Sequence, residues 1–385
     1  MINKIKKVFK NQARRFVASN TPKSAQNNPF NLYGDSYWFT SPNLWEPSVL
    51  LALRDLCRPG MVVFDVGANF GGVTSAMSRL VGPMGTVCAF EASPRIIGYL
   101  QGNVVAQGHR NVTVYHRAVF SESNKSLKVF EGGHLNDSIY EDQSPTKVGH
   151  LVRTLALDDF CGTSNIMPDL VKMDIEGAEF DALKGFVGTI QKKRPHLILE
   201  QQNSDIRCFE LLKEFNYSFL DLSAYQEIKN TQDFGGGKNL MNVLAIHKTK
   251  IGNLPYPWPP EIENICEIGQ VEVIKKEKHL LILKKKTLPQ GRYLFDCQFQ
   301  AAGIKNNMVC LVECNGRTIF RYNAYSKLLA ETYTDWVVDV PFEGDLSIRF
   351  EFLDGTSDDS FIFHHIKVNK IKGLLVQPWP SFVLE

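Results

Sequence analysis

Residues 61–72 read MVVFDVGANFGG, and this stretch decides the fold of the first half of the chain. The β-branched and aromatic run at 61–66 is typical of a buried strand, and the glycines after it are typical of a tight turn before a helix. The stretches GTVCAFEAS at 85–93 and LVKMDIEG at 170–177 repeat this pattern of an apolar run that ends in polar residues. Helical patterns separate these runs, so we expect an α/β fold with a mostly parallel sheet and helices on both faces.

The remaining expected elements extend the same alternation. We expect further strands at 111–119, 196–202 and 242–248, a helix with Ser93 as its N-cap, and one continuous helix over 176–193. In a sheet of this kind, ligands bind beyond the carboxyl ends of the strands, where the strand order reverses. Functional residues are therefore expected directly after the strands.

Length and composition indicate a globular protein with more than one domain. The chain has 385 residues, of which 44% are apolar and 22% are charged, whereas single hydrophobic cores rarely grow beyond about 250–300 residues. We expect a basic segment and loop at 1–45, an α/β domain at 46–250, a proline-rich linker at 251–267 and a second domain at 268–385. Short alternating strands with almost no helical signal predict an all-β, jelly-roll-like sandwich for the last range.

Charge and hydropathy exclude several classes of protein. The formal net charge is +2, so no overall basic field favours nucleic acid as a partner. No apolar run reaches the roughly 18–20 residues that span a bilayer, and residues 1–19 lack the apolar core of a secretory signal. We therefore expect a cytoplasmic protein with reduced cysteines. The basic N-terminus allows a peripheral membrane contact, although a basic tail is the simpler interpretation.

The motif DVGANFGG at 65–72 and the acidic residue Glu91 together predict a nucleoside-binding site. Gly67 permits a sharp turn, and the helix behind it presents free backbone N–H groups. Glu91 ends the next strand, where a carboxylate can accept both hydroxyls of a ribose. The GK[ST] sequence of a P-loop is absent, and the glycine spacing differs from GxGxxG. Asp65 would repel a pyrophosphate, whereas it would attract the ammonium and sulfonium charges of S-adenosylmethionine.

These motifs resemble the FkbM family of S-adenosylmethionine-dependent methyltransferases. The stretches FDVGANFGG, AFEASP, RTLALDDF, VKMDIEGAE and HLILEQQ occur in the family's order over about residues 60–202, with weaker similarity to about residue 248, and NDSI at 136–139 resembles a further segment. The resemblance implies a class I methyltransferase (Rossmann-like) fold, S-adenosyl-L-methionine as cofactor, and methyl transfer to an oxygen. In the family the acceptor is often a hydroxyl of a sugar or polyketide.

The resemblance also indicates which residues contact the cofactor. They come from the ends of the first two strands and from the third strand: Asp65, Gly67, Asn69, Gly71, Glu91, Ser93 and Ala118. One departure lies at Arg117, where the family often has a small polar residue.

The candidate catalytic residues are Asp174, Glu176 and Glu200. Asp174 ends the fourth strand, where the methyl group should be presented, and Glu200 ends the fifth. Glu176 and Glu179 are expected to share a face of the next helix, where acids also stabilise the helix dipole. Methyl transfer needs alignment and a base for the hydroxyl proton, which adds about 10²–10⁴ in rate. Asp174 is the first candidate for that base and Glu200 the second, and Lys172 is open to functional and packing interpretations alike.

Other interpretations stay open at this point. We expect no metal, but Asp174 and Glu200 have the oxygen ligands that Mg²⁺ prefers. His116 and His134 are weaker candidate bases, and GGG at 235–237 fits a lid or, more simply, a hairpin loop.

The predicted function is an O-methyltransferase that acts on a hydroxyl, most readily of a sugar in a polysaccharide or glycolipid. A small-molecule or glycan acceptor is the expected partner, no nucleic acid is expected, and a homo-oligomer is possible. The aromatic residues between Tyr33 and Trp45 suit sugar stacking and core packing equally. The alternatives are a non-catalytic glycan-binding or scaffold protein with a degenerate methyltransferase fold, and, less favoured by the glycine spacing, a nicotinamide oxidoreductase.

Overall fold

The computed structural model describes residues 47–132, 137–141, 144, 146–202, 205–233, 240–268, 271–274, 279–302, 308–324, 332–340, 343–352 and 360–374. These residues divide into two compact units. The first contains Ala52–Leu222 and Gln226–Asn253, and the second contains residues 47–51, Ser223–Tyr225 and the described residues from Leu254 onward. The expected segment at 1–45 with its aromatic residues, His134 and the GGG at 235–237 lie outside the described residues.

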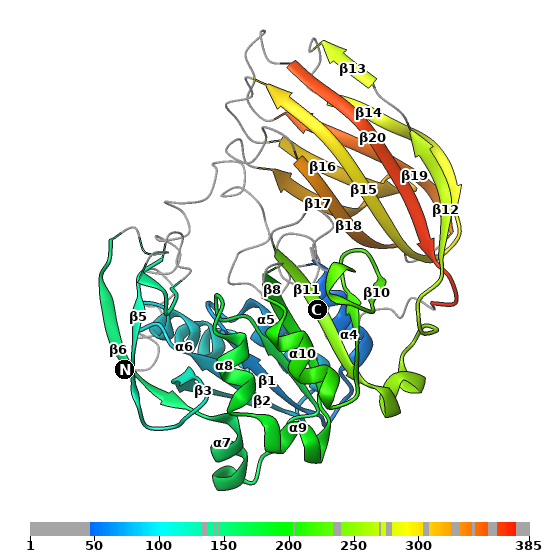
Figure 1. Cartoon of the computed structure of the whole chain (residues 1–385). Coiled ribbons are helices and arrows are strands. Elements are labelled where there is room, and N and C mark those ends of the chain that lie inside the picture. Colours follow the sequence, from blue (N-terminus) through cyan, green and yellow to red (C-terminus); the bar gives the residue numbers. More distant parts are fainter. Residues whose placement is uncertain are drawn as a thin grey trace. The chain divides into compact units, whose positions relative to one another are not determined.

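A mixed sheet forms the centre of the first unit (Figure 1). Among the described residues its strand order is β10-β9-β11-β8-β7-β1-β2-β3. The strands are β1 (Val62–Val66), β2 (Thr86–Glu91), β3 (Val112–His116), β7 (Leu170–Met173), β8 (His196–Gln202), β9 (Tyr217–Asp221), β10 (Gln226–Ile228) and β11 (Leu240–His247). The run from β3 to β8 is parallel, which confirms the predicted mostly parallel sheet.

The strand order reverses between β1 and β7, because β2 and β3 follow β1 on one side and β7 and β8 extend the sheet on the other. A ligand site is therefore expected beyond the carboxyl ends of β1 and β7. The last strand, β11, runs antiparallel between β8 and β9, so it lies inside the sheet and not at its edge. The short strands β9 and β10 were not predicted from the sequence.

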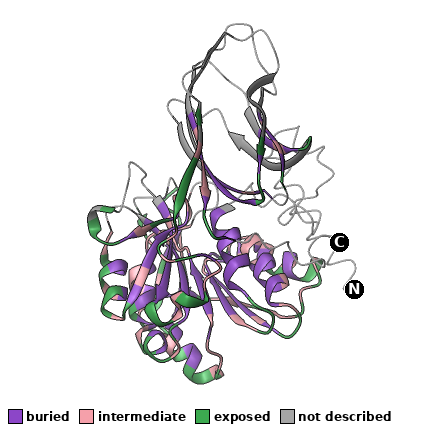
Figure 2. Ribbon diagram, turned by 90° about the vertical axis from the view of Figure 1, so that its right-hand side faces the viewer, coloured by how far each residue is buried: buried purple, intermediate pink, exposed green. Residues whose placement is uncertain are grey.

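Helices cover both faces of this sheet. They are α4 (Pro47–Leu56), α5 (Gly72–Val81), α6 (Ile97–Ala106), α7 (Leu157–Ser164), α8 (Glu179–Lys184), α9 (Val187–Lys193) and α10 (Arg207–Glu214), with the 3₁₀ turns η3 (Thr231–Asp233) and η4 (Lys248–Asn253). Neighbouring residues of a strand point to opposite faces. On β2, Phe90 accordingly packs into a large core with Phe186 of the α8–α9 region, whereas Ala89 packs with Leu100 of α6. Figure 2 shows the strands buried between the helices.

Two helix predictions were wrong in their bounds. The helix expected from Ser93 begins at Ile97, because residues 94–96 form a turn, in which the amides of Ile96 and Ile97 donate to the Ser93 carbonyl. The continuous helix expected over 176–193 is split into α8 and α9 at Gly185. A side chain on Gly185 would begin 2.4 Å from the Phe120 carbonyl oxygen, so the break lets two backbone segments approach closely.

A small separate sheet follows β3. The expected strand over 111–119 stops at His116, and the chain continues as β4 (Ala118–Val119), which pairs with β6 (Gly149–Leu155). The strand β5 (Ser126–Phe130) completes this sheet in the order β4-β6-β5. The segment 137–141 lies between β5 and β6 in the sequence.

The second unit is β-rich, as predicted. One sheet has the order β12-β20-β15-β18 with β13 beside β20, and the other has the order β14-β19-β16-β17. The strands are β12 (Ile262–Ile268), β13 (Val271–Ile274), β14 (His279–Leu288), β15 (Gly291–Ala302), β16 (Met308–Cys314), β17 (Arg317–Ala324), β18 (Thr332–Val340), β19 (Gly344–Phe352) and β20 (Ser360–Ile371). The strand β12 begins at Ile262, within the last part of the range 251–267 that the prolines predict as a linker. A sandwich of the two sheets stays a prediction.

Candidate active site

The ends of four parallel strands of the first unit meet at one level. In the strand register, Val66 of β1 lies beside Phe90 of β2 and Met173 of β7, and Met173 lies beside Leu199 of β8. The next residue of each strand therefore belongs to one row across the sheet, which runs Glu91, Gly67, Asp174 and Glu200. This row stands at the carboxyl ends of β1, β2 and β7 and two residues before the end of β8. It lies where the strand order reverses, and it contains three acidic residues.

The turn after β1 is held by backbone bonds and by a close contact with the chain itself. The amides of Gly67 and Ala68 both donate to the Phe90 carbonyl, at 3.0 Å. Gly67 has φ 79°, and a Cβ atom there would lie 1.7 Å from the carbonyl oxygen of Asp174. Glycine is thus required because the β1 turn packs against the backbone after β7.

Glu91 ties the β1 turn to the segment after β2. Its Oε2 accepts the Asn69 amide at 2.8 Å and its Oε1 accepts the Ser93 amide at 2.7 Å. Burial raises the pKa of the Glu91 carboxyl to about 7, although these two amide bonds act to lower it. Each carboxylate oxygen keeps a further lone pair, so Glu91 can still accept hydroxyl groups.

Asp65 is completely buried one position before the end of β1. One carboxylate oxygen, Oδ2, accepts the hydroxyl of Thr74 on α5, whereas Oδ1 has no hydrogen-bond partner within the described part of the chain. Burial raises the pKa of Asp65, and the nearby charge of Lys172 acts in the opposite direction. An unpartnered buried carboxylate oxygen is costly, so a positively charged ligand nearby would be favoured.

Asp174 is anchored through both its backbone and its side chain. Its amide donates to the Val66 carbonyl at 3.0 Å, which fixes it beside the end of β1. Its Oδ2 lies 3.0 Å from Nζ of Lys172, whose side chain is only 4% exposed. Asp174 itself keeps 21% of its side chain exposed, so it can meet a bound molecule.

The loop after Asp174 differs from the prediction for Glu176 and Glu179. Glu176 has a left-handed backbone, φ 56°, and precedes the helix α8, so the two acids do not share a helix face. Glu179 instead turns back, and its Oε1 accepts the amides of Ile175 at 2.8 Å and Gly177 at 3.4 Å. Burial raises the pKa of Glu179 to about 7. Glu179 therefore shapes this loop, whereas the sequence suggested that it shares a helix face with Glu176 or stabilises the helix dipole.

Asp137 belongs to the NDSI segment at 136–139, but the sequence indicated no role for this residue. Arg95 forms an ion pair with it, and Ser93 Oγ donates to its Oδ2 at 2.5 Å. Burial alone would raise the pKa of Asp137, but these hydrogen bonds lower it below the ordinary range. The neighbouring Ser138 hydroxyl donates to the Glu176 carbonyl at 3.1 Å. The segment 137–141 therefore connects the end of β2 with the loop after β7.

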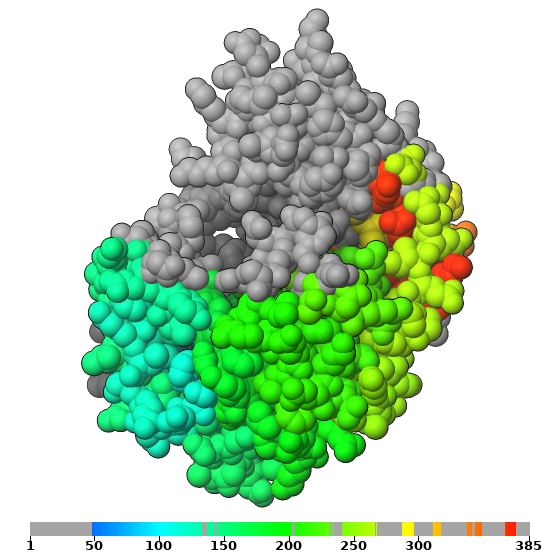
Figure 3. Space-filling model, in the orientation of Figure 1, coloured from blue at the N-terminus to red at the C-terminus, as the bar shows by residue number. Residues whose placement is uncertain are grey.

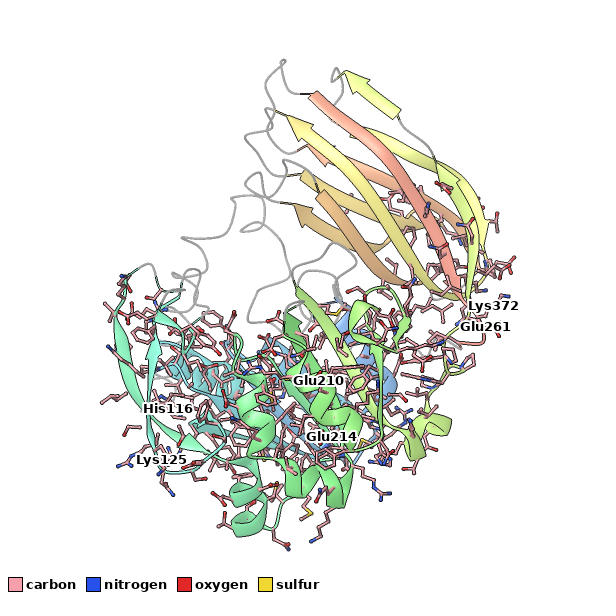
Figure 4. The ribbon with its side chains drawn as sticks, in the orientation of Figure 1. His116, Lys125, Glu210, Glu214, Glu261 and Lys372 are labelled. Atoms are coloured by element: carbon pink, nitrogen blue, oxygen red, sulfur yellow. The ribbon has the colours of Figure 1, made fainter. Side chains whose placement is uncertain are left out.

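The remaining predicted residues are Gly71, Ala118, Glu200 and His116. Gly71, at φ 88°, ends the turn before α5, and Ala118 packs in β4 against Val129 and Val152. Glu200 pairs with Asn242 of the neighbouring strand β11. His116, labelled in Figure 4 beside β3, has its Nε2 3.0 Å from the Ala92 carbonyl oxygen.

A metal site does not emerge among the described residues, where no group of three His, Cys, Asp or Glu residues converges. Lys172 is instead the positive charge that contacts Asp174.

Figure 3 shows the surface of the first unit, in cyan and green, from the side of Figure 1. None of the described helices combines the length and the hydropathy needed to cross a membrane.

Comparison of the sequence with protein families gives a match to the methyltransferase FkbM domain at residues 65–219. Comparison with curated proteins gives no match. Among solved structures, the methyltransferase FkbM of Methylobacillus flagellatus KT matches with 17% identity and a TM-score of 0.35, over 53% of this chain and 47% of that one. This chain thus spans about half the length of that protein.

Two further solved structures show similar scores. A SAM-dependent methyltransferase of Aquifex aeolicus has 15% identity and a TM-score of 0.31 over 56% of this chain and 94% of that one. The fibrillarin of Aeropyrum pernix, solved with natively bound S-adenosyl-L-methionine, has 12% identity and a TM-score of 0.30 over 51% and 73%. The assignment rests on the family match, supported by the strand order described above. Residues 65–219 therefore form a methyltransferase FkbM domain, of a family of S-adenosylmethionine-dependent methyltransferases, within a class I methyltransferase (Rossmann-like) fold.

Proposed function

We propose that this protein binds S-adenosyl-L-methionine at the carboxyl ends of β1 and β2 and methylates a hydroxyl group of its acceptor. The observation that carries the proposal is the row of acidic residues around the Gly67 turn, with Glu91 on one side and Asp174 on the other. The proposal includes action in the cytoplasm on a small-molecule or glycan acceptor.

The residues present fit this cofactor. The unpartnered Oδ1 of Asp65 favours positive charge nearby, and Glu91 retains lone pairs for the two ribose hydroxyls. Asn69 and Ser93 give their amides to Glu91 and so hold its carboxylate in place. The cofactor, when bound, supplies a methyl group on a positively charged sulfur.

The acceptor hydroxyl needs a base and a fixed direction of approach. Asp174 stands next to the Gly67 turn, it is partly exposed, and Lys172 and the Val66 carbonyl hold it in place. We assign Asp174 to accept the hydroxyl proton, with Glu200 as the second candidate on the next strand. A fixed base and a fixed acceptor supply most of what this reaction requires of a protein.

A sugar of a polysaccharide or glycolipid is the acceptor class that we favour. Carboxylates at the strand ends can bind neighbouring hydroxyls as well as deprotonate one of them. The β-rich second unit lies outside the family match, which ends at residue 219, and a glycan-binding role for it belongs to the same proposal.

The decisive experiment uses donor that carries a radiolabelled methyl group, with fractionated cell glycans, lipids and proteins as acceptors. We expect label in a glycan or glycolipid fraction, and the label should resist mild alkali because ethers do and methyl esters do not. Label in the protein fraction alone would contradict the proposed acceptor class. Absence of donor binding by calorimetry would favour the non-catalytic alternative, and inhibition by a chelator that Mg²⁺ reverses would restore the metal alternative.

Cofactor affinity should depend on pH through Glu91. Its pKa of about 7 means that the carboxylate gains its charge as pH rises through neutrality, and a charged acceptor binds ribose hydroxyls more strongly. We therefore expect tighter donor binding at about pH 8 than at pH 6. Glu91→Gln should weaken binding roughly 10- to 100-fold at pH 8 and flatten the dependence.

Calorimetry across this pH range measures both effects. Glu210→Gln is the matched control, because Glu210 lies exposed on α10 and is labelled in Figure 4. An unchanged affinity and slope in Glu91→Gln would remove Glu91 from the cofactor site.

A further inference from the structure

Lys172 is a buried lysine within an otherwise apolar strand. The strand β7 reads Leu-Val-Lys-Met, all four residues are buried, and Lys172 is 3% exposed. A buried ammonium group lowers stability unless carboxylates compensate its charge. Its position in the middle of the sheet therefore calls for a reason beyond packing, because an apolar side chain would pack there without that penalty.

Two carboxylates lie next to this lysine, and two further carboxylates interact with those two. Lys172 Nζ contacts Asp174 Oδ2 at 3.0 Å, and Lys172 lies beside Asp65 in the register of β7 and β1. The charges of Asp65 and Asp174 also act on each other. Glu91 of β2 interacts with Asp65, and Glu179 of α8 interacts with Asp174. Lys172 is thus a buried cation next to acids that repel one another.

We propose that Lys172 is a positioning residue, which holds the Asp174 carboxylate in one orientation and lowers the repulsion between the Asp65 and Asp174 carboxylates. This inference rests on the proposed function, since it concerns the base assigned to the acceptor hydroxyl. In this role Lys172 contacts neither the donor nor the acceptor, and it acts through Asp174.

The physical reason is the repulsion between two nearby carboxylates in a site with little water. Without a cation between them, one of the two takes up a proton at neutral pH. A proton held between the two acids hinders the reaction, because a carboxyl group that already carries a proton cannot accept the proton of the acceptor hydroxyl. The charge of Lys172 reduces the repulsion that favours uptake of this proton. Its hydrogen bond at 3.0 Å also limits the rotation of the Asp174 carboxylate.

The test replaces Lys172 by methionine, which has a similar length and no charge. For Lys172→Met we expect kcat to fall about 100-fold at pH 6 and to recover as pH rises toward 9, because both carboxylates then ionise without the lysine. Lys172→Arg, which keeps the charge, should retain the pH profile of the natural protein. Lys184→Met is the control, because Lys184 forms an ion pair with Asp181 on the exposed side of α8.

A second measurement does not depend on turnover. Isotope-edited infrared spectroscopy of the full chain without donor should show more protonated aspartic acid at pH 7 in Lys172→Met than in the natural protein. If Lys172→Met fails to fold, Lys172→Gln serves for both measurements. Equal loss of kcat at every pH, with no new protonated aspartic acid, would show that Lys172 only packs and would overturn the inference. Failure of the natural protein to transfer methyl groups would instead overturn the proposed function, and the infrared result would still stand.

Discussion

Asp174→Asn is expected to lower kcat by about 10²- to 10⁴-fold while changing donor affinity by only a few-fold. The asparagine oxygen can still accept the hydrogen bond from Lys172 Nζ, and the backbone amide can still donate to Val66. The loop should therefore keep its shape while the base is lost. Single-turnover methyl transfer and calorimetry with the donor separate the two effects.

Asp181→Asn provides the matched control for this substitution. Asp181 forms its ion pair with Lys184 on α8, away from the strand ends, so its loss should leave turnover unchanged. Persistence of turnover in Asp174→Asn would end its assignment as the base. A larger loss in Glu200→Gln would move that role to the end of β8.

Gly67→Ala is expected to abolish donor binding and to lower the melting temperature sharply. The added Cβ would lie 1.7 Å from the Asp174 carbonyl oxygen, and the backbone would have to keep φ near 79°. A positive φ costs an alanine roughly 1–2 kcal/mol. The clash is with backbone, so the β1 turn and the loop after β7 must move apart and carry Asp174 with them.

Gly60→Ala separates the cost of the positive φ from the cost of the clash between the added Cβ and the backbone. Gly60 has φ 85°, but a Cβ there would meet nothing within 4 Å. It should show only the cost of the backbone conformation and retain donor binding. Equal losses of melting temperature in the two variants would contradict the close contact between Gly67 and Asp174.

Several features were predictable because they depend on neighbouring residues in the sequence. Apolar runs that end in Gly67, Glu91 and Asp174 indicated parallel strands, and the carboxyl ends of such strands meet at one edge of the sheet. The alternation of strands and helices therefore predicted both the fold and the place of the site. The DVGANFGG and DIEGAE motifs indicated the family that the match over residues 65–219 then confirmed.

Other features were decided by contacts between residues far apart in the sequence. The break at Gly185 follows from the approach of the backbone at Phe120, and Gly67 is required because of the Asp174 carbonyl. Helical periodicity carries no information about such approaches, so the sequence predicted one continuous helix over 176–193.

The sequence by itself determined which acids stand at the strand ends, because hydrophobic periodicity marks where each strand stops. Only the tertiary structure decided what each acid does there. Glu179 turns back to bind the amides of its own loop, Asp137 pairs with Arg95, and Lys172 contacts Asp174 within the sheet. The physical reason is that burial and the distance to an opposite charge govern a carboxylate, and both depend on the strands and loops that folding brings beside it.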